Sequence, residues 1–207
     1  MGYTITYRID STIEEIEEKI IALEGEHICK LEVDLHMYYH KTVSSDMKIA
    51  VSEYYERCFF IHEKEEEETF CAFSYSKEKS FCDSFETEAD FKSYLDHSGV
   101  YDYKSSIPII GNVWRMGDFV IRLGLITIGL TSKHILIQVE YGVLSTYKAT
   151  VFIEDFLKQL LTDEGVKKII SLKTDINDFF PDKKEEKSMM PHFRLRQYCL
   201  PIIEDLS

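Results

Sequence analysis

Residues 112–142 read NVWRMGDFVIRLGLITIGLTSKHILIQVEYG. β-branched and aromatic residues dominate this stretch, and Gly124, Gly129 and the step 131–133 interrupt it, a pattern typical of short strands joined by tight turns. We therefore predict three antiparallel strands, over residues 113–123, 125–130 and 134–141.

Alternation along these strands divides their side chains between two faces, because neighbouring residues of a strand point to opposite sides of the sheet. One face is predicted to hold Phe119, Ile121, Leu123, Ile135, Ile137, Val139 and Tyr141. The opposite face is predicted to hold Val120, Arg122, Leu136, Gln138 and Glu140. Apolar residues stand on both faces, so we expect helices to cover one face and a lumen or a partner to cover the other.

The rest of the chain alternates between strand and helix patterns. Further strands are predicted over residues 3–9, 28–39, 54–62, 69–75 and 79–84. Helices are predicted from the Ser11–Thr12 capping box to Gly25, over 87–97 with Thr87 as N-cap, and over 150–162. Residues 166–172 fit a helix or a strand, and the charged run 63–68 is expected to be a solvated hairpin tip. We expect one domain over 1–207, with a polar linker at 175–187 and a terminal helix at 188–200.

Composition limits the classes of function. The chain has 207 residues, 44% of them hydrophobic, and a net charge of −13. This is enough to bury a core, but the charge opposes binding to phosphate-rich nucleic acid, so protein partners are favoured. Five cysteines without a C-x-x-C pair indicate a reducing compartment, and no apolar run reaches the roughly 20 residues that cross a membrane.

The central stretch also carries a family resemblance. The ordered series is Asp118–Phe119, the alternating strand Val120–Leu123, the turn Thr127–Gly129 and the ending Val139–Gly142. With FCAFSY at 70–75 and FIEDFLKQLL at 152–161, this series resembles the Mediator of RNA polymerase II transcription subunit 20 family.

The resemblance implies a mainly β, α+β fold. It is a closed antiparallel barrel of about eight strands, flanked by three or four helices and related to the triphosphate-tunnel fold. It also implies a non-catalytic nuclear subunit of the Mediator head module without a cofactor. The implied partners are Mediator subunit 18 in a heterodimer, subunit 8 and other head-module subunits, and indirectly RNA polymerase II, with no direct nucleic acid and no membrane.

An enzymatic alternative follows from the same fold relation. Metal-dependent tunnel triphosphatases hold a divalent ion with carboxylates that converge from facing strands. Glu32, Asp34 and Glu140 are the equivalent candidates, but Gln138 stands where a second carboxylate would complete the motif. His36 and His40 are four residues apart, yet they lie in a predicted strand and loop, so a zinc site there is disfavoured.

Partner-binding residues are expected on the central strands, since aromatic and aliphatic anchors are enriched in interfaces. Trp114 is an anchor for the core or for a partner. The candidate set is Trp114, Met116, Val120, Arg122, Ile126 and Ile128.

Overall fold

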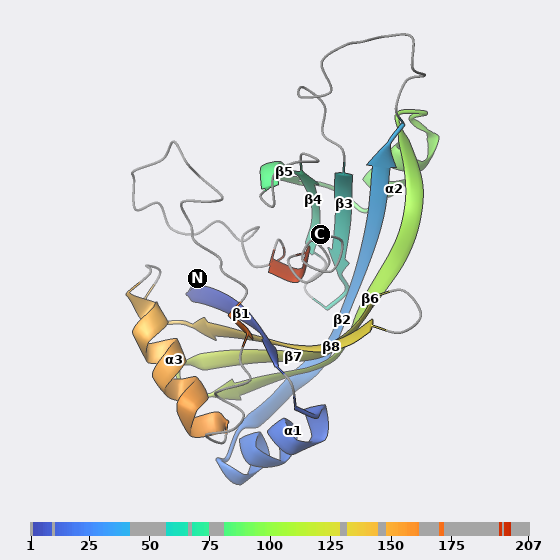
Figure 1. The fold of residues 1–207 in the computed structure, drawn as a ribbon. Helices are drawn as coiled ribbons and strands as arrows, with labels where there is room; N and C mark the ends of the chain where they lie inside the picture. The colour runs from blue at the N-terminus through green and yellow to red at the C-terminus, as the bar shows by residue number, and fades with distance from the viewer. Residues whose placement is uncertain are drawn as a thin grey trace.

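The computed structural model describes residues 2–9, 11–41, 57–65, 68–74, 81–128, 132–144, 148–161, 170–171, 195 and 197–199. These residues form a nine-stranded antiparallel sheet, three α-helices and one 3-10 turn (Figure 1). The strands are β1 (Tyr3–Ile9), β2 (Glu26–His40), β3 (Arg57–Glu63), β4 (Glu68–Ser74), β5 (Phe81–Glu86), β6 (Tyr101–Met116), β7 (Phe119–Ile128), β8 (Ser132–Tyr141) and β9 (Ile170–Ser171). The helices are α1 (Ile13–Ala22), α2 (Phe91–His97), α3 (Ala149–Leu160) and the 3-10 turn η2 (Gln197–Cys199).

Two long strands hold the sheet together. The strand order is β5-β4-β3-β2-β6-β7-β8-β1-β9, with the pair β2–β6 at the junction of its two halves. β2 carries register shifts between His27 and Cys29 and between Met37 and Tyr38, and such bulges bend and twist a strand. In Figure 1 the long pair curves along the molecule, so that β3–β5 at one end and β7, β8 and β1 at the other face a common concave side.

This sheet confirms the mainly β fold, but it does not confirm the closed barrel of about eight strands that the family resemblance led us to expect. It has nine strands, and its end strands β5 and β9 do not pair with each other in the described part of the chain. η2 (red) lies in the angle between the two halves of the sheet (Figure 1). The buried side chains of Leu195, Tyr198 and Cys199 pack against the concave face of the sheet, which we call the inner face. In a closed barrel, the strands of the opposite wall would cover this face.

The predicted turn at Gly124 is wrong. The first hairpin of the central unit turns at residues 117–118, where Gly117 has a φ of +56°, while Gly124 lies inside β7. A Cβ on Gly124 would stand 2.8 Å from Cγ2 of Ile109, so this glycine allows close packing instead of a turn. β6 also begins at Tyr101, well before the predicted strand start at residue 113, because this segment pairs along its length with β2.

The predicted faces of β7 and β8 are confirmed. The outer-face core contains Ile121, Leu123, Ile137 and Val139 from the sheet, together with Ile16 and Ile20 of α1 and Ile153, Leu157 and Leu160 of α3. The inner-face core contains Leu31, Val33, Leu35, Phe59, Ile61, Ile107, Ile109, Ile126 and Leu136, together with Leu195, Tyr198 and Cys199. α2 covers the outer face at the other end, over Tyr38, Cys58, Phe60 and Cys71.

The helix starts agree in part with the sequence. The capping box of α1 is present, with Thr12 as N-cap and Glu15 as its reciprocal partner. α2 begins at Phe91, after an Asp90 N-cap without a side-chain bond, so Thr87 is not the cap. The ambiguous segment 166–172 contributes the short strand β9, while the predicted linker 175–187 and most of the segment 188–200 lie outside the described residues.

Candidate functional site

A buried ion cluster lies on the concave face of the sheet. The guanidinium of Arg122 lies between two carboxylates: its Nη1 is 3.1 Å from Oε2 of Glu140 and its Nε is 3.9 Å from Oε1 of Glu63. The side chains of Arg122 and Glu63 are 6% and 2% exposed, and that of Glu140 is 21% exposed. We call Glu63, Arg122 and Glu140 the inner cluster. Because charges are costly to remove from water, this cluster is stable only with its cation and carboxylates together.

Three strands bring the inner cluster together. Arg122 on β7 stands opposite Gln138 on β8, so Glu140 is two residues along the same face of β8. Glu63 ends β3 on the face shared with Phe59 and Ile61. The expectation that the run 63–68 is entirely solvated is therefore wrong at its first residue, because Glu63 is 1% exposed.

A chain of buried hydrogen bonds continues the inner face toward the C-terminal turn. Nε2 of Gln138 donates to Oγ1 of Thr6 at 2.9 Å, and Thr6 Oγ1 donates to Oε1 of Gln197 at 2.5 Å. Nε2 of Gln197 then donates to the backbone oxygen of Thr4 at 2.9 Å. Gln197 is fully buried, and both ends of its amide are bonded to β1. Leu195, Tyr198 and Cys199 pack beside it, so residues near the C-terminus cover part of the concave face.

The predicted lumen carboxylates do not converge. Glu32 and Asp34 lie on the outer face of β2, where Nζ of Lys64 is 3.2 Å from Oε2 of Glu32 and 3.4 Å from Oδ2 of Asp34. We call these three residues the outer cluster, whose side chains are 37–46% exposed. The hydrogen bond to Glu32 is the largest cause of the raised pKa of Lys64, and Asp34 adds to it. Glu140 lies on the opposite face of the sheet, so it cannot share an ion with Glu32 and Asp34.

The six candidate partner-binding residues are divided between the two faces. Trp114 is 8% exposed on the outer face and stacks edge-on against His27, with ring centroids 5.0 Å apart. Met116 packs beside the same core with partial exposure. Four of the candidates belong to the inner face of β7: Val120, Arg122, Ile126 and Ile128. Arg122 and Ile126 are buried, while Val120 and Ile128 keep partial exposure.

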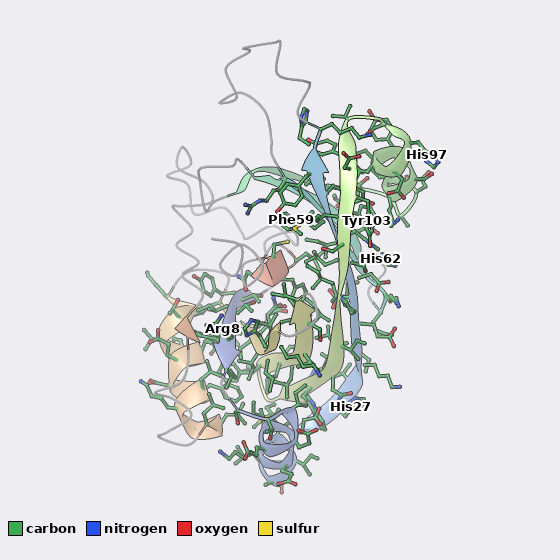
Figure 2. All side chains as sticks on the ribbon, turned by 45° about the vertical axis from the view of Figure 1, so that its right-hand side comes forward. Arg8, His27, Phe59, His62, His97 and Tyr103 are labelled. Atoms are coloured by element: carbon green, nitrogen blue, oxygen red, sulfur yellow. The ribbon has the colours of Figure 1, made fainter. Side chains whose placement is uncertain are left out.

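The two histidines considered for a metal site have aromatic neighbours. His36 lies 6.1 Å from the rings of both Phe60 and Tyr103, and His40 lies 5.4 Å from that of Tyr101. Burial is the largest cause of the lowered pKa of His36. In the ranges that the structure describes, no group of three or more His, Cys, Asp or Glu side chains is arranged to hold a metal ion. Figure 2 shows His62 and Tyr103 on the side of the long β2–β6 pair away from Arg8, which lies on β1.

Sequence reasoning missed Glu63, Thr6 and Gln197. Strand parity could have placed Glu63 inward with Phe59 and Ile61, but the adjacent glutamates obscured that signal. Thr6 lies in the strand over residues 3–9, and the sequence pattern of this strand does not show which of its faces is buried. Gln197 becomes recognisable only through contacts with β1, more than 190 residues away in the sequence.

Among the described residues of the inner face, Gln138, Thr6 and Gln197 are hydrogen-bonded in series, and buried apolar side chains pack around them. In the described part of the chain, no helix is long and apolar enough to cross a membrane.

Comparison with known protein families gives a match over most of the chain. A family model described as the TATA-binding related factor (TRF) of subunit 20 of the Mediator complex matches residues 1–199. Comparison with curated protein sequences gives no match.

Solved structures are similar in fold at low sequence identity. The PH1012 protein of Pyrococcus horikoshii OT3 is 12% identical, with 80% of this chain and 93% of that chain covered and a TM-score of 0.50. The HpAC1 protein of Hippeastrum, named for adenylyl cyclase and dominant triphosphatase activities, is 11% identical over 77% and 88%, with a TM-score of 0.48. A chain of the Schizosaccharomyces pombe Mediator head module is 10% identical over 76% and 90%, with a TM-score of 0.41. At these identities the first likeness concerns the fold alone, and the other two are too distant to support a conclusion.

Proposed function

Because this chain belongs to the Mediator subunit 20 family, we propose that it is a non-catalytic subunit of the Mediator head module that pairs with Mediator subunit 18. Subunit 8 links this pair to the remaining head subunits, and Mediator connects regulators to RNA polymerase II. The chain acts in the nucleus, requires no cofactor, and binds proteins instead of nucleic acid. The observation that carries this proposal is the family match over residues 1–199 of a 207-residue chain.

The packing of the C-terminal residues on the concave face supports a role without catalysis. A tunnel triphosphatase needs an open lumen in which several carboxylates hold a divalent ion. Glu32 and Asp34 point away from that face, and Arg122 already occupies the space between Glu63 and Glu140. The curvature of β2 and β6 around η2 supports the further proposal that the sheet is related to the eight-stranded triphosphate-tunnel barrel.

The pairing surface that we propose includes Val120 and Ile128. Both lie on the inner face of β7, pack against the inner core, and remain partly exposed. They flank the buried Arg122 and Ile126. A partner can therefore pack against the existing apolar core without disrupting the ion pairs of Arg122. Trp114 and Met116 belong to the opposite face and are left out of this surface.

Co-purification from nuclear extract tests the proposal. A tagged chain is expected to recover subunit 18, subunit 8 and other head subunits in stoichiometric amounts. Val120→Asp combined with Ile128→Asp is expected to reduce recovery of subunit 18 about tenfold or more, because a buried unpaired carboxylate is strongly unfavourable. Ile110→Asp is the matched control, since Ile110 is 61% exposed on the outer face.

Two results would contradict this function. One is recovery of no Mediator subunits with a folded chain. The other is release of phosphate from triphosphate-ended RNA with manganese or magnesium, provided that the activity is lost on Glu32→Ala.

A further inference from the structure

Three exposed aliphatic residues lie close together in the sequence where α1 passes into β2. Ile21, Leu23 and Ile28 are 59%, 50% and 41% exposed, and they lie within eight residues of one another along the chain. We call residues 21–28 the α1–β2 corner. Single exposed aliphatic residues are common on protein surfaces, but a concentration of them at one place is typical of an interaction site.

Backbone hydrogen bonds and close packing stabilise the turn at this corner. The N–H of Gly25 donates to the carbonyl of Ile20 at 2.8 Å, and the N–H of Glu24 donates to that of Ile21 at 3.0 Å. A Cβ on Gly25 would lie 2.4 Å from Cγ2 of Ile20 and 3.1 Å from Cγ of Met116. Because Ile20 is fully buried in the outer core, the corner is anchored to the rigid part of the molecule. A partner therefore meets a preformed surface and loses little affinity to ordering it.

The charge around the corner is strongly negative. Residues 11–30 contain six glutamates and two lysines. Glu18, Glu24 and Glu26 are exposed, and the ion pairs seen among the described residues do not include them. Glu24 also follows the carboxyl end of α1, where the partial charge of the helix is negative. A cation placed there would be attracted by both the glutamates and the helix end.

His27 shows that the corner belongs to the outer face. Its ring stacks edge-on against buried Trp114, and its Nε2 lies 3.2 Å from Oδ1 of Asn112. In Figure 2, His27 lies at the end of the long strand pair, beside α1. Val120 and Ile128 occupy the inner face of the sheet, so this corner and the proposed pairing surface are separate.

We propose that the α1–β2 corner binds a basic protein segment in which aliphatic or aromatic anchors stand between lysine or arginine residues. The anchors cover Ile21, Leu23 and Ile28, and the basic residues neutralise the surrounding glutamates. A second copy of this chain fits less well, because the net charge of −13 makes two copies repel. Nucleic acid is disfavoured by the same charge. This site goes beyond the pairing with subunit 18 and does not depend on it.

Fluorescence anisotropy with a labelled amphipathic peptide, composed of leucine and lysine at helical spacing, tests the site on the full chain. Saturable one-to-one binding is expected, weakened about tenfold or more by Leu23→Ser combined with Ile28→Ser, because few anchors carry most of the binding energy. Glu18→Gln, Glu24→Gln and Glu26→Gln together are expected to weaken binding and to reduce its salt dependence. The matched controls are Ile110→Ser and Glu88→Gln at exposed positions elsewhere, which are expected to change the affinity by less than about twofold.

Peptide controls separate the apolar contribution to binding from the electrostatic one. Replacing the leucines of the peptide by serine, or its lysines by glutamate, is expected to abolish saturable binding. The proposal is overturned if no peptide binds, if the control variants weaken binding as much as the corner variants, or if the serine peptide binds equally well. Self-association of the chain that is lost on Leu23→Ser, measured by sedimentation, would instead assign the corner to an interface between copies and would also overturn it.

Discussion

The inner and outer clusters have the same composition, one cation between two carboxylates, on opposite faces of one sheet. Lys64 is 46% exposed and lies beside two carboxylates of the same strand. Arg122 is 6% exposed and lies between carboxylates of two different strands. The two clusters differ in their exposure to water. Water screens the charges of the outer cluster and is largely excluded from those of the inner cluster.

This difference determines how costly it is to remove one partner from each cluster. Exposed ion pairs contribute about 0–1 kcal/mol, since two mobile side chains must be ordered for a screened attraction. Loss of one partner of a buried pair costs about 3–5 kcal/mol, because it leaves charge in a poorly solvated place. The conspicuous E-x-D motif therefore belongs to the cluster that tolerates loss of a partner, and the sensitive cluster is assembled from residues distant in sequence.

The largest effect is expected for Arg122→Met. This change retains much of the side-chain volume but removes the guanidinium between Glu63 and Glu140, so the free energy of unfolding should fall by about 3–5 kcal/mol. Urea unfolding at neutral pH measures it. Adding Glu63→Gln and Glu140→Gln to Arg122→Met should restore a large part of the loss. A cost below about 1 kcal/mol for the single change would show that the inner cluster is not electrostatically distinct from the outer one.

An intermediate effect is expected for Gln197→Leu, which tests the neutral part of the inner face. The substitution removes the bonds to Thr6 and Thr4 while keeping similar volume, and it leaves buried polar groups of β1 without those bonds. We expect the free energy of unfolding to fall by about 1–3 kcal/mol. Gln159→Leu, on the exposed side of α3, is the matched control. Equal stabilities of the two variants would mean that η2 is not held by these bonds.

The smallest effect is expected for Lys64→Met. The free energy of unfolding should fall only slightly, and far less than for Arg122→Met, because Glu32 and Asp34 stay in contact with water. The difference from the parent chain should disappear at about 1 M salt, where screening acts over about 3 Å, whereas the loss caused by Arg122→Met should persist. If high salt removes both effects equally, the two clusters do not differ in solvation as the structure indicates.

Strand parity predicted the two faces of β7 and β8, since the alternation of side chains is a property of the extended backbone. Parity also applies to Glu63, yet the following glutamates suggested a solvated tip and concealed its inward position. Glycine was the other source of error: Gly117 forms a turn, but Gly124 lies against Ile109 within a strand. A sequence does not distinguish these uses, because one depends on backbone φ and the other on a neighbour from another strand.

Local patterns in the chain were sufficient for the capping box of α1, the amphipathic helix α3, the two faces of β7 and β8 and the family resemblance. All of these depend on residues a few positions apart, where the periods of helix and strand operate. Tertiary structure decided the curvature of β2 and β6, the position of η2 on the concave face, and the choice between Glu32–Asp34 and Glu63–Arg122–Glu140 as the buried cluster. Those outcomes depend on which distant side chains share a face and exclude water, and pairings of that kind exist only once the strands have come together.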